Sequence, residues 1–242
     1  IYDVSFLGMG ASALATAKLK YKGTSISLIG IDKNYHSKRN NFFAFWLTDW
    51  MKDFDSLAQK KWFCWNFYLT NNHIKHETKD LPYCTIRYQD WKNYCLKGLE
   101  NLSIKEFNVQ SITNLKKYYE IKLENGEEIF AKKIYDSRTP KLENEKVKQH
   151  FFGYLIETKQ MINSNSVTLM DFRVEQKMGL HFMYCLPIDE NRMLVESTVF
   201  SSEIQEDAWY QKQILEYIET KLNLSEYKIC LLYTSPSPRD RQ

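Results

Sequence analysis

Charged residues in the segment 168–200 lie inside strand-like apolar sequence rather than around it. Side chains alternate along a strand, so Asp171 and Arg173 are expected on one face. Two further alternating runs cover residues 182–186 and 193–199, with polar residues between them. The segment therefore predicts a strand followed by a β-hairpin.

The turn of this hairpin decides which side chains lie opposite one another. Symmetric closure about residues 189 and 190 pairs Met183 with Glu196 and His181 with Thr198. Glu196 is then expected on the face of Met183 and His181. A shift of one residue in register would reverse that inference. The alternative is that Glu196 points to water on the open side of an antiparallel sheet.

Residues 1–32 follow the order strand, glycine turn, helix, strand. Gly8 permits the tight turn, Gly10 lets a pyrophosphate approach the backbone, and Ala13 allows close packing of helix on strand. Asp32 ends the second strand, 22 residues after Gly10, which suits a carboxylate that binds ribose hydroxyls. The pattern predicts a dinucleotide site without choosing between FAD and NAD. The alternative is an ordinary strand-helix turn.

The middle of the chain continues this α/β pattern. A helical pattern at 89–99 precedes three short strand patterns, the last at 129–134, and Asn-Gly at 125–126 predicts a hairpin turn before it. Asp136 follows that strand, where loops of an α/β sheet often meet a ligand, so it is a further candidate cofactor contact. A capping box at 202–205 begins another helix.

These patterns predict two domains and a tail. Residues 1–145 are expected to form the dinucleotide-binding domain, with an aromatic-rich insertion at about 42–90, and residues 146–229 to form an incomplete substrate domain of sheet and helix. Residues 230–242 contain CLLYTSPSPRD, which resembles translated sequencing adapter. We expect this tail to be an artefact and the chain to be a C-terminally truncated fragment.

Composition narrows the classes of partner. The chain has 242 residues, a net charge of +3 and no block of like charge, so no nucleic-acid partner is expected. No apolar run approaches the roughly 20 residues of a membrane span. The four cysteines before residue 230 form no CxxC pair, which favours a reduced cytosolic protein. We expect no metal site, because His73 and His76 lie in polar, loop-like sequence.

Tryptophan, phenylalanine and tyrosine are concentrated in two stretches, at 42–54 and 60–69. Core packing is one interpretation. The other is an aromatic-lined cavity or a lip that faces a membrane around Trp46 and Trp65, with Lys60 and Lys61 beside it. The sequence leaves both open.

Several segments together resemble the flavin-dependent lycopene cyclases of bacterial carotenoid synthesis. Order and spacing run in step with that family over almost all of residues 1–229. The most specific segments are LMDFRVEQ and LVEST, and the others are the Gly-Met-Gly turn with Asp32, Phe45-Trp46, QHFFG through IET, and YCLP. Two departures stand out: Asn40-Asn41-Phe42-Phe43 replaces an acidic-Arg-Thr-Trp run, and the glycine-rich segment that completes the flavin pocket would lie beyond residue 229. We therefore expect the fragment alone to bind flavin poorly and to be inactive.

The resemblance implies an α/β fold of flavoprotein hydroxylase-like architecture, in which an FAD/NAD(P)-binding Rossmann-like domain is joined to an antiparallel β-sheet substrate domain. It implies cyclisation of the ends of lycopene, or of a related linear carotenoid, to β-ionone rings without net redox change. It further implies reduced FAD, NADPH as the electron source, and a cytoplasmic location at the inner face of the cell membrane. The membrane surface and other carotenoid enzymes are the expected partners.

Cyclisation needs a carboxylic acid that stays protonated near neutral pH, which burial in an apolar cavity can achieve. Glu196 corresponds to the glutamate that the family requires, so the resemblance assigns it as the acid. Asp171 and Arg173 are candidates for the site, although a structural ion pair is the favoured interpretation. Glu157 is a secondary candidate, with a strand-end charge as the alternative.

Phe182, Tyr184 and Phe200 could stabilise a carbocation with their ring faces, but the expected register divides them between the two faces of the hairpin. Two rival functions remain open. One is another FAD-dependent oxidoreductase, either a hydroxylase or an isoprenoid reductase, that acts on an apolar substrate. The other is a carotenoid-binding or flavin-storage protein.

Overall fold

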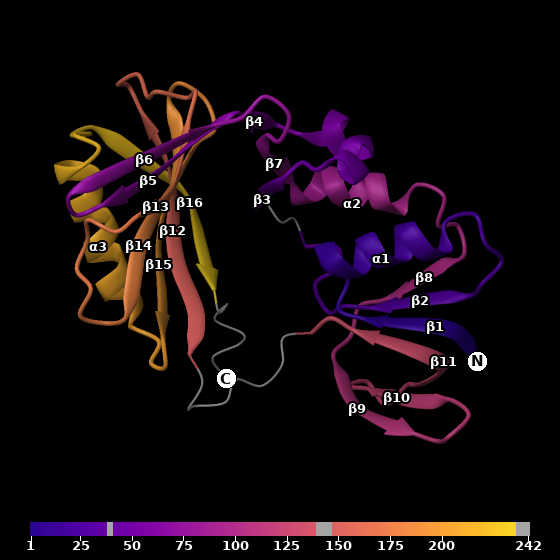
Figure 1. Cartoon of the computed structure of the whole chain (residues 1–242). Helices are drawn as coiled ribbons and strands as arrows, with labels where there is room; N and C mark the ends of the chain where they lie inside the picture. The colour runs from indigo at the N-terminus through magenta and orange to yellow at the C-terminus, as the bar shows by residue number, and fades with distance from the viewer. Residues whose placement is uncertain (38–40, 139–146, 236–242) are drawn as a thin grey trace. The chain divides into compact units, whose positions relative to one another are not determined.

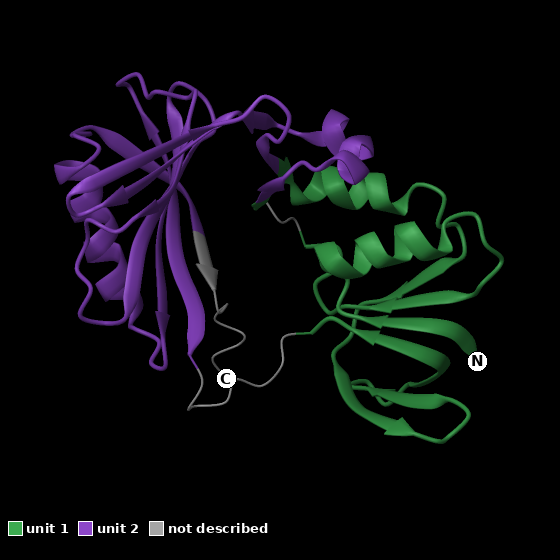
Figure 2. Cartoon of the chain, viewed as in Figure 1, with its two compact units in different colours: residues 1–43, 86–140 green, residues 44–85, 141–242 purple. Residues whose placement is uncertain are grey.

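The computed structural model describes residues 1–37, 41–138 and 147–235. The chain forms two compact units, coloured separately in Figure 2. Unit 1 comprises residues 1–43 and 86–140, and unit 2 comprises residues 44–85 and 141–242.

Unit 1 is built on a six-stranded sheet in the order β8-β2-β1-β11-β10-β9. The strands are β1 (Tyr2–Leu7), β2 (Leu28–Ile31), β8 (Leu102–Lys105), β9 (Val109–Asn114), β10 (Tyr119–Leu123) and β11 (Glu128–Asp136). The four strands from β8 to β11 are parallel, whereas β10 and β9 are added antiparallel. Helix α1 (Ala11–Tyr21) lies over the sheet and packs beside α2 (Tyr88–Leu96) (Figure 1). This is the predicted α/β arrangement, with the predicted hairpin turn between β10 and β11.

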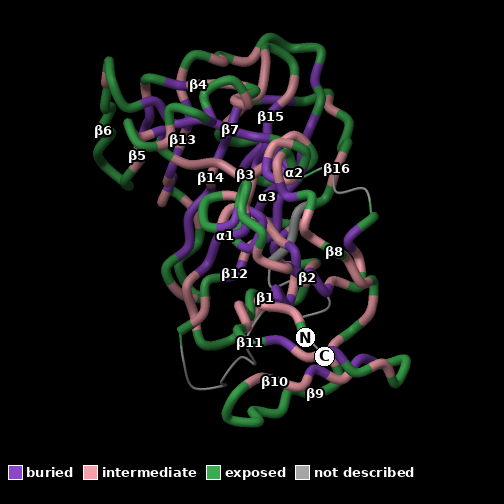
Figure 3. Tube along the Cα trace, turned by 90° about the vertical axis from the view of Figure 1, so that its right-hand side faces the viewer, coloured by how far each residue is buried: buried purple, intermediate pink, exposed green. Residues whose placement is uncertain are grey.

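Unit 2 contains a seven-stranded sheet in the order β16-β12-β15-β14-β13-β5-β6. Its strands are β5 (Cys64–Leu69), β6 (Asn72–Glu77), β12 (Lys148–Thr158), β13 (Val167–Asp171), β14 (Leu180–Pro187), β15 (Arg192–Ser201) and β16 (Tyr227–Ser235). All neighbours are antiparallel except β13 and β5. Helix α3 (Asp207–Thr220) packs on one face, over a core from β12, β14 and β15, whose traces are largely buried (Figure 3).

A smaller sheet joins β3 (Phe42–Trp46), β7 (Tyr83–Arg87) and β4 (Lys60–Trp62), with a 3₁₀ helix, η1 (Asp49–Leu57), beside it in sequence. Along the chain, β3 and β7 each begin in one unit and end in the other. The aromatic-rich segment was expected within a first domain of residues 1–145. Most of it instead clusters with unit 2, because β5 pairs with β13.

The expected boundary at residue 229 falls inside β16, which pairs with β12 as far as Ser235. Backbone pairing at a sheet edge depends little on side-chain identity. The assignment of residues 230–242 as an adapter-derived tail therefore stays a prediction. Residues 236–242 lie outside the described part of the chain.

The hairpin β14-β15 forms as predicted, but its expected register is wrong by one residue. Tyr184, not Met183, lies opposite Glu196, and Val199, not Thr198, lies opposite His181. The turn is centred on Glu190, because the backbone N–H of Ile188 donates to the Arg192 carbonyl at 2.8 Å. The slip moves Glu196 to the other face of the sheet.

Candidate active site

The glycine turn of unit 1 follows β1 and leads into α1. Gly8 has φ +80°, and its N–H donates to the Ile31 carbonyl at 2.8 Å. A Cβ on Gly8 would lie 3.1 Å from the Ser137 hydroxyl oxygen, whereas a Cβ on Gly10 would meet nothing within 4 Å. The turn is thus tight at Gly8 and open at Gly10. Ala13 is buried where α1 faces the sheet, as its small side chain predicts.

Side chains from distant segments donate hydrogen bonds to the backbone carbonyls of this turn. The Ser137 hydroxyl donates to the Leu7 and Gly8 carbonyls at 3.1 and 2.8 Å. The Tyr88 hydroxyl donates to the Met9 carbonyl at 2.8 Å, and the Trp91 indole N–H to the Ala11 carbonyl at 3.1 Å. The N–H groups of the first turn of α1 have no partner within the helix. This arrangement favours binding of a phosphate at the helix start.

Asp32 lies beside the turn at the end of β2. Its carboxylate accepts hydrogen bonds from the backbone N–H groups of Met9 and Asn34, each at 2.9 Å. Asp32 thus ties the end of β2 to the glycine turn, and its role in binding ribose stays a prediction.

Asp136 ends β11, directly beside Leu7 of β1. The Arg138 guanidinium donates to both of its carboxylate oxygens, at 2.9 and 2.7 Å, and these bonds hold the pKa of Asp136 below its ordinary value. The strand order reverses between β1 and β11, which is where α/β sheets bind ligands. Gly8, Asp32 and Asp136 therefore lie at the carboxyl ends of neighbouring strands. The Asp136 carboxylate is already paired with Arg138.

Glu196 lies in unit 2, in the middle of β15. It faces away from α3, between Tyr184 on β14 and Gly153 on β12. The same face carries an apolar cluster of Trp62, Trp65, Tyr83, Val167, Leu169, Leu186 and Leu194, with Tyr184 packed against it. The Glu196 side chain is partly buried.

Burial raises the pKa of Glu196 to about 7, although the Thr198 hydroxyl, which donates to Oε1 at 2.8 Å, acts in the opposite direction. A substantial fraction of this carboxyl is therefore protonated near neutral pH. Beside it, the Tyr83 and Tyr184 hydroxyls are hydrogen-bonded at 2.7 Å. Burial raises the pKa of Tyr83 to about 12 and that of Tyr184 as well, so both phenols stay neutral.

Phe182, Tyr184 and Phe200 all lie on the face of Glu196, because the pairs Phe182–Thr198 and Leu180–Phe200 continue the observed register. The expectation that these rings are divided between faces is wrong, for the same one-residue slip. The rings of Phe182 and Phe200 stack with centroids 6.3 Å apart. An acid that is protonated near neutrality thus shares a face with three aromatic rings, which can stabilise positive charge.

The family model described as Lycopene cyclase protein matches residues 3–231. The chain belongs to the lycopene cyclase family. Its fold is also similar to solved structures at low identity. One is a geranylgeranyl bacteriochlorophyll reductase-like protein from Thermoplasma acidophilum, with TM-score 0.71 and 11% identity over 97% of this chain and 65% of that one.

A second is p-nitrophenol 4-monooxygenase PnpA from Pseudomonas putida DLL-E4, with TM-score 0.68 and 12% identity over 97% of this chain and 67% of that one. A third is halogenase PltM in complex with phloroglucinol and FAD, with TM-score 0.64 and 11% identity over 97% and 60%. The lycopene cyclase-family chain thus spans about two thirds or less of the length of these structures and has the expected flavoprotein fold. No curated protein sequence matches it.

In this lycopene cyclase-family chain, Asp171 and Arg173 form the ion pair that the sequence favoured. The fully buried Asp171 carboxylate accepts bonds from Arg173 at 2.9 and 2.6 Å and from the Tyr217 hydroxyl of α3 at 2.7 Å. Burial alone would raise the pKa of Asp171, but these bonds hold it below its ordinary value. Arg173 also lies 4.1 Å from the centre of the Tyr68 ring. The pair faces α3, on the opposite face of the sheet from Glu196.

Glu157 is exposed near the end of β12, opposite Arg192. It lies four positions from Gly153 along β12, which corresponds to about 13 Å. The structure does not bring it to Glu196. The neighbours of Glu196 that sequence reasoning missed are Gly153, Thr198 and Tyr83. A glycine inside a strand pattern is the signal for the first, whereas Tyr83 comes from a distant segment and has no local signal.

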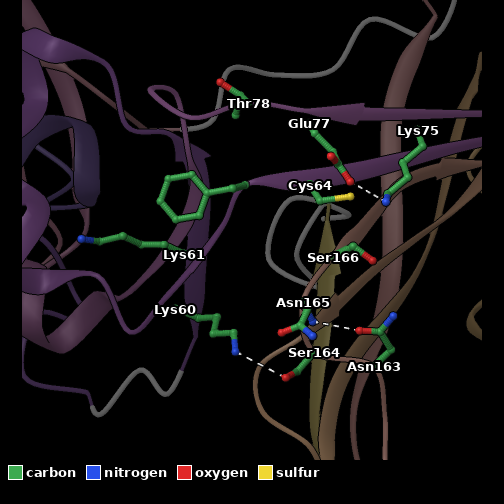
Figure 4. Close-up of a pocket in the computed structure, with 11 residues that line it drawn as sticks. Lys60, Lys61, Cys64, Lys75, Glu77, Thr78, Asn163, Ser164, Asn165 and Ser166 are labelled. Carbon is green, nitrogen blue, oxygen red and sulfur yellow. Dashed lines mark hydrogen bonds and ion pairs between the residues drawn. The ribbon is translucent and has the colours of Figure 1, made fainter.

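A polar hollow of about 490 Å³ lies elsewhere in unit 2, between the start of β5 and the loop 163–166 (Figure 4). Lys60 lies 3.4 Å from the Ser164 hydroxyl oxygen, and Lys75 pairs with Glu77 at 2.5 Å. None of the predicted site residues lines this hollow. Within the described ranges, no helix is long and apolar enough to cross a bilayer.

Proposed function

We propose that the protein cyclises the linear ends of lycopene, or of a related carotenoid, to β-ionone rings by acid catalysis. One observation carries the proposal: in a member of the lycopene cyclase family, an apolar sheet face holds Glu196 with its pKa raised to about 7. An acid with such a pKa can be protonated before the reaction and ionised after it.

The reaction balances without an oxidant or a reductant. The Glu196 carboxyl gives its proton to the terminal double bond of the polyene, and a neighbouring double bond attacks the resulting cation to close the ring. Loss of one proton from a ring carbon then forms the new double bond. One proton is gained and one is lost, so the product is an isomer of the substrate.

The surroundings of Glu196 suit each step. The apolar cluster around Leu186 and Leu194 excludes water that would trap the cation. The ring faces of Phe182, Tyr184 and Phe200 stabilise positive charge as it forms. The Thr198 hydroxyl stabilises the carboxylate that remains after proton donation.

We propose FAD as the cofactor of unit 1, held by Gly8, Gly10, Ala13 and Asp32, with Asp136 beside it. The fit rests on the open space at Gly10 and on the turn whose carbonyls are already bonded. Reduced flavin, when bound, would supply a negative charge, and negative charge can stabilise a carbocation. NADPH is the proposed source of its electrons.

We further propose that the substrate is collected from a membrane surface at the cytoplasmic face, with other carotenoid enzymes as possible neighbours there. Trp46 and Trp50 are exposed by 41% and 73%, whereas Trp65 is buried against the sheet. Of the two tryptophans expected to form the membrane-facing lip, only Trp46 is exposed. We therefore assign the lip to Trp46 and Trp50 instead. If replacement of both by serine left liposome binding of the folded protein unchanged, this docking role would be ruled out.

The test is expression of the complete gene in lycopene-accumulating cells, followed by chromatography and mass measurement of the pigments. We expect a cyclic product of unchanged mass from the wild type and none from Glu196→Gln, with flavin retained in both. A product whose mass differs by oxygen or hydrogen would instead identify a hydroxylase or an isoprenoid reductase. Carotenoid bound without any conversion would identify a binding protein.

A further inference from the structure

Two residues constrain the Glu196 side chain: Thr198, two positions along the same strand, and Gly153, opposite it on β12. The Thr198 hydroxyl donates to Glu196 Oε1 at 2.8 Å. A Cβ on Gly153 would lie 3.2 Å from Glu196 Cβ and 3.3 Å from Cγ, so the stem of Glu196 lies across the bare backbone of β12. The stem and one oxygen are both fixed.

The Thr198 hydrogen bond fixes one oxygen of the Glu196 carboxyl group. A protonated carboxyl has one carbonyl oxygen and one hydroxyl oxygen. The Thr198 hydroxyl can donate to the ionised carboxylate, and it can donate to or accept from the protonated acid, so it keeps Oε1 in place in either state. Thr198 is almost fully buried, with 1% of its surface exposed, so water does not compete freely for its hydroxyl.

We propose that Thr198 is a positioning residue, which holds Oε1 of Glu196 and so sets the orientation of the whole carboxyl group, while Gly153 gives the Glu196 stem the room to lie in that orientation. This role rests on the proposed cyclisation. It assigns to Thr198 two effects: orientation of the acid before proton transfer, and stabilisation of the carboxylate afterwards.

The adjacent Ser197 offers a matched comparison. Its hydroxyl is equally buried on the same strand, but it faces the opposite side of the sheet and is hydrogen-bonded to His181 Nε2 at 2.8 Å. Ser197→Ala therefore removes a buried hydroxyl from β15 without touching Glu196. A merely structural role of β15 hydroxyls would make the two positions behave alike.

The experiment compares Thr198→Val, Thr198→Ser and Ser197→Ala in the protein expressed from its complete gene. Titration of the Glu196 carboxyl is followed by infrared difference against Glu196→Gln, and the cyclisation rate is measured against pH. In Thr198→Val the bond that favours the ionised form is lost, so the pKa of Glu196 rises, and we expect a midpoint about one pH unit higher. The rate should fall by roughly tenfold to a hundredfold, and Thr198→Ser should restore both.

Ser197→Ala should leave the midpoint of Glu196 unchanged. An unchanged midpoint in Thr198→Val would overturn the proposal, as would equal changes in Thr198→Val and Ser197→Ala. If Thr198→Val does not fold, Thr198→Ala takes its place, with the same upward shift expected. The titration needs no lycopene, so a shifted midpoint in a protein that makes no ring would refute the proposed function and retain the link between Thr198 and Glu196.

Discussion

Replacement of Glu196 by glutamine should make the folded protein more stable at alkaline pH. The pKa of Glu196 rises from its ordinary value of 4.5 to about 7 because burial disfavours the charged form. Between these two values the folded state binds more protons than the unfolded chain. Stability therefore falls as pH rises through this window, and below it the wild type carries no such penalty.

The magnitude follows from the two pKa values. Each pKa unit corresponds to about 1.4 kcal/mol, so a rise from 4.5 to about 7 costs about 3 kcal/mol once Glu196 is fully ionised. Glutamine has nearly the same shape, can accept the Thr198 hydrogen bond and does not titrate. The free energy of unfolding of Glu196→Gln should thus exceed that of the wild type by about 3 kcal/mol more at about pH 8.5 than at about pH 4.5.

The assay is urea unfolding of both proteins at the two pH values. Unfolding of unit 2 is followed by tryptophan fluorescence, because Trp62 and Trp65 belong to the cluster beside Glu196. The matched control is Glu157→Gln, the same chemical change at an exposed position, for which we expect less than about 0.5 kcal/mol at either pH. A wild-type to Glu196→Gln difference that does not change with pH would refute the argument that burial keeps this acid protonated.

Three other changes test separate parts of the account. Asp171→Asn should lower the free energy of unfolding of unit 2 by about 3 kcal/mol or more, since it breaks a buried ion pair and weakens the bond from Tyr217; a loss below about 1 kcal/mol in urea unfolding would contradict this. Gly8→Ala adds a Cβ 3.1 Å from the Ser137 hydroxyl at φ +80°, so flavin affinity should fall by roughly tenfold, and an unchanged affinity in a fluorescence titration would count against the proposed FAD site. Tyr83→Phe removes the bond to Tyr184 and should cost about 1 kcal/mol, with no further cost when Tyr184→Phe is added, as a double-mutant cycle can test.

Local patterns predicted the elements on which the site is built. The glycine turn, Asp32 and the strand ending at Asp136 depend on short-range spacing, so the sequence located them correctly. The hairpin strands also followed from alternation. The register of these strands did not follow from alternation, because it depends on where the turn is centred. Alternation cannot distinguish a turn centred on Glu190 from one centred half a residue earlier.

Contacts between distant segments account for what the sequence missed. Tyr83 reaches Tyr184 only because residues 44–85 join unit 2, through the pairing of β5 with β13. Gly153 lies beside Glu196 because β12 and β15 pair over their whole length. Neither pairing leaves a periodic signal in the sequence. The family resemblance identified Glu196, whereas the structure identified what surrounds it.

The central claim is that the Glu196 carboxyl is protonated near neutral pH, and infrared spectroscopy can measure this directly. Protonated and ionised carboxyl groups absorb at different frequencies, and the difference between wild type and Glu196→Gln isolates this one group. We expect the band of the protonated acid to persist at about pH 6 and to disappear with a midpoint at about 7. A carboxyl that is fully ionised at about pH 6 would contradict the account.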